Sequence, residues 1–429
     1  MRGISRRLIA VAAAVLVGAT AAPTVAQAHG KSYYKVGYFT QWGIYGRNFQ
    51  VSKVQASGAA AKLTHLNYAF GNVSSSGTCV SADSWADWGV PFTAELSVDG
   101  VADVAGQPIS GNLNQLAELK QKNPNLKVLI SLGGWTGSAY FSDAALTAES
   151  RAKLVSSCVD LWIKGDLPGL APGAGAGIFD GVDLDWEWPG SDGNAGNVIR
   201  PEDKQNFTLL AAEFRSQLSD LGKSTHKHYD LTAFLPAAPA KIDAGFEASK
   251  IFKYLDFGTV QGYDFHGSWE TRTNQQSALR VPAGAPDNPD FSVENAINAW
   301  TERGAPRREL VLGLPYYGQG WTGTTGAGLF APATGPAVGT FAAGTEDYKV
   351  LKTLTTQGYT LYRDWKDGTS WLSDGTTFWT YDDPAQLLQK TAYIRGAGLG
   401  GAMMWSLDGD DSHASLTKAV ATGLWTPWP

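Results

Sequence analysis

Cysteine, histidine and positive charge are all scarce in this sequence. Its 429 residues include two cysteines, Cys79 and Cys158, and six scattered histidines, a supply that argues against a zinc site. The formal net charge of −6 excludes the basic face that a nucleic-acid-binding protein needs. Charged residues make up only 17% of the chain and hydrophobic residues 43%, which excludes a disordered chain. One disulfide is possible, and the sequence leaves open whether the two cysteines pair.

Long hydrophobic runs are missing as well. Beyond the first residues, no stretch approaches the ~18 apolar residues of a membrane span, so we expect no membrane contact. At the N-terminus, three arginines precede the short apolar run 8–16 and a small-residue site at 26–28, an order typical of a secretory signal peptide. The general and the twin-arginine export routes both fit. We expect residues 1–28 to be removed, which leaves a secreted, extracellular protein of net charge near −9 because three arginines and no acid are lost.

Tryptophan is the residue present in excess. The chain has 16 Trp, and aromatic residues make up 11% of it. A Trp side chain offers a large apolar face together with an N–H that needs a partner. This number exceeds what core packing requires, and it predicts surfaces that bind a flat ligand.

Short strand-like runs alternate with amphipathic helical runs along the rest of the chain. This alternation predicts a parallel α/β sheet, and a count of eight strands favours a closed (β/α)8 or TIM barrel. The predicted strands are 35–39, 63–70, 127–132, 181–185, 230–235, 257–263, 310–314 and 400–405, and the predicted helices include 113–122, 149–162, 204–221, 293–303 and 384–395.

The interval between the last two predicted strands is longer than one helix requires. Residues 317–379 are rich in Gly, Thr, Tyr and Trp, and loops of that length without structure are uncommon. We therefore expect an inserted α+β subdomain between strands seven and eight. No Ser/Thr/Pro-rich linker follows the last barrel helix, so we expect no separate carbohydrate-binding module.

Three carboxylates alternate with apolar residues along the fourth predicted strand. Asp183, Asp185 and Glu187 share one face because strand side chains alternate. In a barrel they point inward, and Glu187 lies at the carboxyl end of the strand, where barrel active sites lie. Three adjacent interior carboxylates cannot all ionise at low cost, so at least one keeps a proton near neutral pH, as a general acid requires. A metal site or a solvated acidic face fits less well, because no histidine joins the group and the strand's other face is apolar.

The stretch 180–187, DGVDLDWE, resembles the DGxDxDWE signature of glycoside hydrolase family 18, the chitinases and their relatives. Three further stretches resemble motifs of this family in the expected order: SLGG at 131–134, QGYD at 261–264 and GAMMW at 401–405. The resemblance implies a family 18 catalytic domain over residues 29–429, with an insertion like that of the bacterial subfamily with a deeper cleft.

The resemblance implies retaining, substrate-assisted hydrolysis of the β-1,4 bonds between N-acetylglucosamine units of chitin. The 2-acetamido oxygen of the bound sugar would attack its own C1 and form an oxazolinium ion. Glu187 would protonate the leaving oxygen and then activate water. Asp185 and Tyr263 would hold the acetamido group, and Asp183 would share a proton with Asp185.

Substrate-binding residues follow from the same resemblance. Asp264 would bind the sugar, and Gln261 stands where the family commonly has Met, so its amide would tune binding. Ser131 and Tyr38 would hold Asp183. Aromatic residues just past the strands would form a sugar track, with Trp405 as its floor: Trp42, Trp135, Trp188 and Trp321, and with more weight on packing, Trp269. Tyr316, Tyr317 and Gln319 would line the cleft where the insertion begins.

Two other functions remain compatible with this sequence. An endo-β-N-acetylglucosaminidase acting on glycoprotein glycans would use the same acidic strand, and a non-catalytic relative would bind chitin as a lectin. The expected partners are chitin and chitooligosaccharides, with no cofactor and no metal. A monomer is the family default, and the sequence leaves open endo or exo action, direction and processivity.

Overall fold

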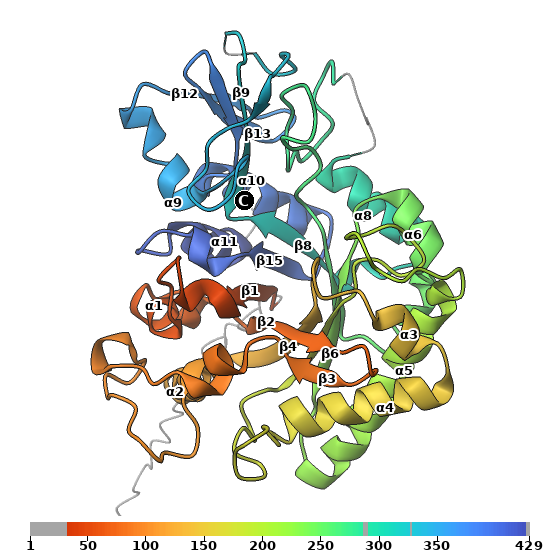
Figure 1. Ribbon diagram of the computed structural model, residues 1–429. Helices are drawn as coiled ribbons and strands as arrows, with labels where there is room; N and C mark the ends of the chain where they lie inside the picture. The colour runs from red at the N-terminus through yellow and green to blue at the C-terminus, as the bar shows by residue number, and fades with distance from the viewer. Residues whose placement is uncertain (1–31, 286–290, 327, 426–429) are drawn as a thin grey trace, which may run out of the picture. The chain divides into compact units, whose positions relative to one another are not determined.

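The computed structural model describes residues 32–285, 291–326 and 328–425 (Figure 1). The expected signal peptide, residues 1–28, lies outside this range. Within the described residues, the structure has no helix that is both long and apolar enough to cross a membrane.

Eight parallel strands of the described chain close into a barrel. Each pairs in parallel with the next, and β15 returns to pair with β1, with Tyr34 opposite Gly401. All eight strands overlap the predicted ones, so the predicted TIM barrel is confirmed. The barrel strands are β1 (Tyr34–Thr40), β2 (His65–Val73), β4 (Lys127–Gly133), β5 (Gly181–Asp185), β6 (Asp230–Leu235), β7 (Phe257–Val260), β8 (Leu310–Pro315) and β15 (Gly401–Trp405).

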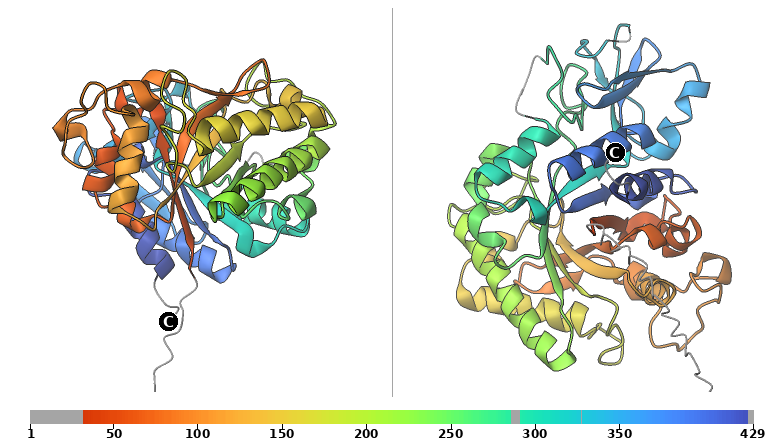
Figure 2. Two further views of the ribbon diagram at one scale, coloured as in Figure 1. Left: turned by 90° about the horizontal axis from the view of Figure 1, so that it is seen from below. Right: turned by 180° about the vertical axis from the view of Figure 1, so that it is seen from behind.

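Helices pack around the barrel through their apolar faces (Figure 2). On α5 (Asp203–Thr225), Leu210, Phe214 and Leu218 are buried at four-residue spacing, the spacing of one helix face. They share a single hydrophobic core with the outward side chains of β5. The other helices are α1 (Val51–Ala56), α2 (Gly111–Lys122), α3 (Phe141–Ala145), α4 (Ala148–Cys158), α6 (Pro239–Gly245), α7 (Ala248–Ile251), α8 (Val293–Glu302), α9 (Tyr348–Leu351), α10 (Pro384–Gly396) and α11 (Ser415–Trp425).

A second sheet lies between β8 and β15 in the chain, at the top of Figure 1. Within the described residues its strands follow the antiparallel order β10-β9-β14-β13-β12, and β11 also pairs with β9. Together with α9 it occupies the interval 317–379, for which the sequence predicts an α+β insertion. The strands are β9 (Tyr317–Thr322), β10 (Gly335–Pro336), β11 (Thr345–Asp347), β12 (Thr360–Asp364), β13 (Thr369–Ser373) and β14 (Thr377–Thr380).

Ion pairs join this second sheet to the barrel loops. The guanidinium of Arg47, in the loop after β1, donates to both carboxylate oxygens of Asp347 at 2.9 and 2.7 Å. The same nitrogen lies 3.1 Å from the carboxylate of Asp408, which follows β15. Both carboxylates are buried, so these contacts are shielded from water and are stronger than surface pairs. They tie three separate segments together beside the carboxyl ends of β1 and β15.

The two cysteines form a disulfide. Cys79, in the short strand β3 (Cys79–Ser81), is bonded to Cys158 at the end of α4, with Cα atoms 4.9 Å apart. The backbone N–H of Cys79 also donates to the Ser157 hydroxyl at 2.8 Å. The bond fixes the long segment after β2 to the helix that follows β4, which answers the question that the sequence left open.

Candidate active site

The carboxylates of β5 form a row inside the barrel. Asp183 is fully buried and Asp185 nearly so, while Glu187 lies two residues past the carboxyl end of β5 and is partly exposed. The intervening Val182 and Leu184 are buried on the outer face, against the helices. The alternation along a strand therefore places three acids on one inner face.

Asp183 is the best-satisfied member of the row. Three hydroxyl groups of the described residues donate to its carboxylate, from Tyr38 at 2.6 Å, Ser131 at 2.8 Å and Thr232 at 2.6 Å. Ser131 and Thr232 are also the strand partners of Asp183 on β4 and β6. Burial raises the pKa of Asp183, and the three donors oppose this shift because they stabilise the ionised form.

Burial and neighbouring charges raise the pKa of both Asp185 and Glu187. Burial raises the pKa of Asp185 well above its ordinary value, and the charges of Glu187 and Asp183 add to the shift. Its Oδ1 has no hydrogen-bond partner among the described residues. Burial, together with the charge of Asp264, raises the pKa of Glu187 to about 8, and Lys241 opposes the shift. Glu187 is thus a carboxylic acid that can donate a proton near neutral pH.

The end of β5 is held by the SLGG stretch of β4. Gly133 and Gly134 have φ angles of 110° and 79°, which glycine adopts without strain. A Cβ on Gly133 would lie 2.3 Å from the backbone oxygen of Asp185, so only glycine fits. The Gly134 N–H donates to that same oxygen at 2.8 Å, and the Glu187 N–H donates to the Ser138 hydroxyl at 2.9 Å. The backbone that carries the acid is therefore fixed from one side.

The loop after β7 faces the acids from across the cleft. β7 ends at Val260, three residues before its predicted end, and the chain turns at Asp264, whose φ is 55°. Asp264 accepts a hydrogen bond from the Gln319 amide at 2.9 Å, and burial raises its pKa. Burial and nearby carboxylates raise the pKa of Tyr263 well above its ordinary value, so its O–H stays protonated. The Gln261 side-chain oxygen accepts from the Ala237 N–H at 3.4 Å.

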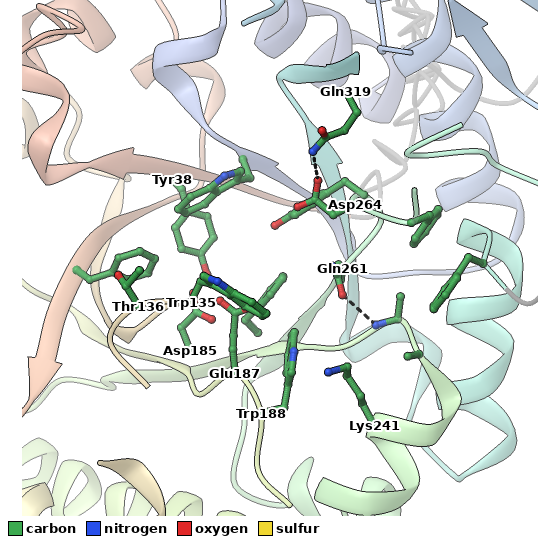
Figure 3. Close-up of a pocket in the computed structure, with 18 of the residues that line it drawn as sticks. Tyr38, Trp135, Thr136, Asp185, Glu187, Trp188, Lys241, Gln261, Asp264 and Gln319 are labelled. Carbon is green, nitrogen blue, oxygen red and sulfur yellow. Dashed lines mark hydrogen bonds between the residues drawn. The ribbon is translucent and has the colours of Figure 1, made fainter. Parts of the chain in front are cut away.

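These groups line one cleft of about 700 Å³ (Figure 3). The predicted site residues on its wall are Tyr38, Trp42, Trp135, Asp185, Glu187, Trp188, Gln261, Tyr263, Asp264 and Trp405. The predicted residues Ser131 and Asp183 are not on the wall: both are buried in the barrel, where Ser131 donates to Asp183. Sequence reasoning missed Thr232, Phe70, Phe234 and Lys241; only the inward register of Thr232 on β6 could have signalled its role.

Aromatic rings form one side of the cleft. The Trp405 ring stacks with Phe70 at a centroid distance of 5.8 Å, and Phe70 stacks with Trp42 at 6.0 Å. Trp135 is 50% exposed on another part of the rim. Trp269, for which the sequence gives packing more weight than for Trp135, lines the cleft and is 62% exposed. Flat apolar faces of this kind suit the C–H faces of a sugar ring.

The prediction that Trp321 belongs to the sugar track is wrong. Trp321 lies inside β9 and is 0% exposed. Its indole N–H donates to the backbone oxygen of Glu270 at 3.1 Å, and its ring packs against Phe378. Tyr316 is likewise buried, with its O–H donating to Thr417 at 3.2 Å. Trp321 serves the packing of the insertion because the chain is already in the second sheet there, whereas Tyr316 packs against α11 of the barrel.

Comparison with known proteins decides the family. The protein-family model described as "Glycosyl hydrolases family 18" matches residues 35–410 of the sequence. The chain belongs to glycosyl hydrolase family 18. It is 40% identical over 384 residues to Chitinase C of Streptomyces lividans, covering 88% of this chain and 58% of that protein. It is 37% identical over 443 residues to Chitinase A1 of Niallia circulans, covering 93% of this chain and 59% of that protein.

Solved structures of family 18 proteins share this fold. The catalytic domain of psychrophilic chitinase B from Arthrobacter TAD20 superposes with a TM-score of 0.88 at 47% identity, covering 91% of this chain and 95% of that one. Chitinase ChiA74 from Bacillus thuringiensis superposes with a TM-score of 0.79 at 34% identity, covering 93% of this chain and 71% of that one. The chain spans a little under two thirds of the length of the curated relatives above. The resemblance seen in the sequence is confirmed.

One cluster of metal-ligating side chains lies away from the cleft. Among the described residues, His228, Asp230 and Asp256 bring their ligand atoms within 4.8 Å of one another. Lys127 already contacts Asp230 at 2.7 Å, and Arg215 contacts Asp256 at 2.6 Å. These cations neutralise both carboxylates, so the cluster is a network of ion pairs.

The raised pKa of Glu187 makes the stability of the fold depend on pH. The folded state holds this proton up to about pH 8, whereas the unfolded chain releases it near 4.5. Within that window the folded state binds this proton more tightly, so the contribution of Glu187 to the unfolding free energy falls by about 1.4 kcal/mol per pH unit. Glu187→Gln removes this dependence, and its melting temperature should rise relative to the native protein as the pH increases.

Thermal unfolding across this pH window measures the effect. Glu302→Gln, the same change at an exposed position on α8, is the matched control and should follow the native curve. A constant offset between Glu187→Gln and the native protein at every pH would contradict the assignment.

Trp321 is buried and Trp135 is half-exposed, so their removal should change the unfolding free energy by very different amounts. Trp321→Ala removes a fully buried ring and should lower the unfolding free energy by about 3–5 kcal/mol. Trp135→Ala removes a half-exposed ring and should change it by less than about 0.5 kcal/mol. Denaturant unfolding of the two variants provides the comparison, and equal losses would contradict the placement of both rings.

Proposed function

We propose that the protein is a chitinase that hydrolyses the β-1,4 bonds between N-acetylglucosamine units, with retention and with assistance from the substrate. The observation that carries this proposal is the state of Asp185. An ordinary retaining glycosidase needs an ionised carboxylate as nucleophile. Asp185 is buried beside two other acids, its Oδ1 has no donor among the described residues, and burial raises its pKa, so the ionised form that a nucleophile needs is disfavoured. When the substrate supplies the nucleophile, the protein does not need to provide one.

The geometry supports a role for each group in this reaction. Glu187 donates its proton to the glycosidic oxygen while the 2-acetamido oxygen attacks C1, and the leaving sugar departs. The resulting oxazolinium ion is opened by a water molecule that gives its proton to the Glu187 carboxylate, which restores the acid. Tyr263, protonated and facing the cleft, donates to the acetamido group.

Asp185 and Asp183 stabilise the positive charge of the intermediate. Asp185 accepts a hydrogen bond from the acetamido N–H while its own proton moves toward Asp183. The hydroxyl groups of Tyr38, Ser131 and Thr232 contact Asp183 and can accommodate this proton, because each can either donate or accept a hydrogen bond. The pair therefore shares one proton and titrates as a unit.

Chitin is the substrate that the cleft favours. The curated relatives in the comparison carry the name chitinase, and an exposed aromatic track suits a linear, uncharged polysaccharide. Trp405 beneath the reacting sugar, with Asp264 and Gln261 on the cleft wall, would bind sugar groups. We also propose that the enzyme is secreted, on the basis of residues 1–28, and acts as a monomer on chitin and chitooligosaccharides.

Replacing Glu187 tests the reaction directly. Glu187→Gln keeps the shape but loses the transferable proton, and soluble sugar released from colloidal chitin should fall by about 10²–10⁴-fold. Glu302→Gln is the control and should keep the native rate.

A high-mannose glycopeptide separates the alternatives. The native protein should release sugar from chitin and leave the glycopeptide intact. Release from the glycopeptide alone would favour an endo-β-N-acetylglucosaminidase, and binding of chitin without any release would favour a lectin. Either result would overturn the proposal.

A further inference from the structure

Lys241 is the only cationic side chain among the described residues that line the cleft. It lies on α6, the short helix that follows β6. The acidic side chains on the wall are Asp185, Glu187 and Asp264. The proposed substrate is uncharged, so recognition of chitin itself does not require a cation here.

The position of Lys241 relates it to the leaving group. Its ammonium lies 6.0 Å from the centre of the Trp188 ring, and Trp188 follows Glu187 directly. In Figure 3, Glu187 and Trp188 lie between Tyr38 and Lys241. Tyr38 packs edge-on against Trp405, the proposed floor for the reacting sugar, at 5.2 Å. A sugar beyond Glu187 on the Lys241 side is therefore the one that leaves.

Away from the cleft, the contacts of the Lys241 ammonium within the described residues are to one residue, Asp192. It pairs with the Asp192 carboxylate at 3.0 Å and donates to the Asp192 backbone oxygen at 2.5 Å. The Asp192 side chain is 90% exposed, and an exposed pair contributes about 0–1 kcal/mol to stability. The Lys241 side chain is only 24% exposed, so its charge acts on the cleft at reduced screening.

We propose that Lys241 is a specificity-determining residue that excludes glucosamine, the deacetylated unit, from the leaving-group side of the cleft. This inference rests on the proposed function. Glucosamine carries a protonated amine where N-acetylglucosamine carries a neutral amide, so the two cations repel each other. The reacting side is selected differently, because a sugar without an acetyl group cannot form the oxazolinium ion. Both new chain ends are thus acetylated, for separate physical reasons.

The test uses a soluble chitosan with about half of its units acetylated, at about pH 5, where a primary amine is protonated. Mass-spectrometric sequencing of the products reads both new ends: the new non-reducing end comes from the leaving side, and the new reducing end from the reacting side. Lys241→Met should raise the share of glucosamine at the new non-reducing end by about three- to tenfold at low salt. At ~1 M salt the native protein should approach the variant, because screening weakens the repulsion.

Two variants separate charge from structure. Lys241→Arg keeps the charge and should keep the native selection. Asp192→Asn breaks the ion pair without removing the cation, so it should retain or strengthen the selection. An unchanged share of glucosamine in Lys241→Met, or an equal rise in Asp192→Asn, would overturn the inference.

Fully acetylated oligomers and the new reducing end keep this failure distinct from failure of the proposed function. If the native protein cleaves the oligomers and leaves N-acetylglucosamine at every new reducing end, the proposed function holds and the Lys241 result stands on its own. If it cleaves none, or leaves glucosamine at new reducing ends, the proposed function falls and the inference falls with it.

Discussion

The site depends on the cost of keeping three carboxylates together in a dry barrel interior. Water would stabilise their charges, and the barrel removes most of that water, so the row keeps protons that free carboxyls would lose. The hydroxyl groups of Tyr38, Ser131 and Thr232 make one end of the row, Asp183, the easiest to ionise. Among the described residues, no comparable set of donors contacts Asp185 or Glu187, and burial with neighbouring charge raises the pKa of both. An acid and a proton-sharing pair thus arise from three similar residues through their surroundings alone.

The rest of the molecule holds this row and shapes the space above it. Glycines in β4 let the backbone approach the end of β5 closely, and the loop after β7 brings Tyr263 and Asp264 across the cleft. The insertion supplies Gln319, which holds Asp264. Arg47 ties the insertion to the loops after β1 and β15, next to the aromatic side that includes Trp42 and Trp405. These contacts favour a preformed cleft for a stiff polysaccharide.

The sequence predicted the parts of the structure that follow from local pattern. Alternating polarity placed the three acids on one face, and the spacing of strands and helices predicted the barrel. It could not predict contacts between distant segments. Thr232 reads as an ordinary strand residue until the register places it opposite Asp183. Trp321 was misplaced because a Trp just past a barrel strand looks like a loop residue, whereas the chain there continues into a second sheet. Lys241 gave no signal in the sequence, because its importance comes from being the one cation among the described residues that line the cleft.

The central claim is that Glu187 is a protonated acid at neutral pH in the free protein. Infrared difference spectroscopy, native protein minus Glu187→Gln, follows the C=O stretch of this one carboxyl group across a pH titration. The account predicts that the protonated band persists through neutrality and disappears around a pKa of about 8. Loss of the band near the ordinary value of 4.5 would contradict it, because the acid would then be ionised before it could act.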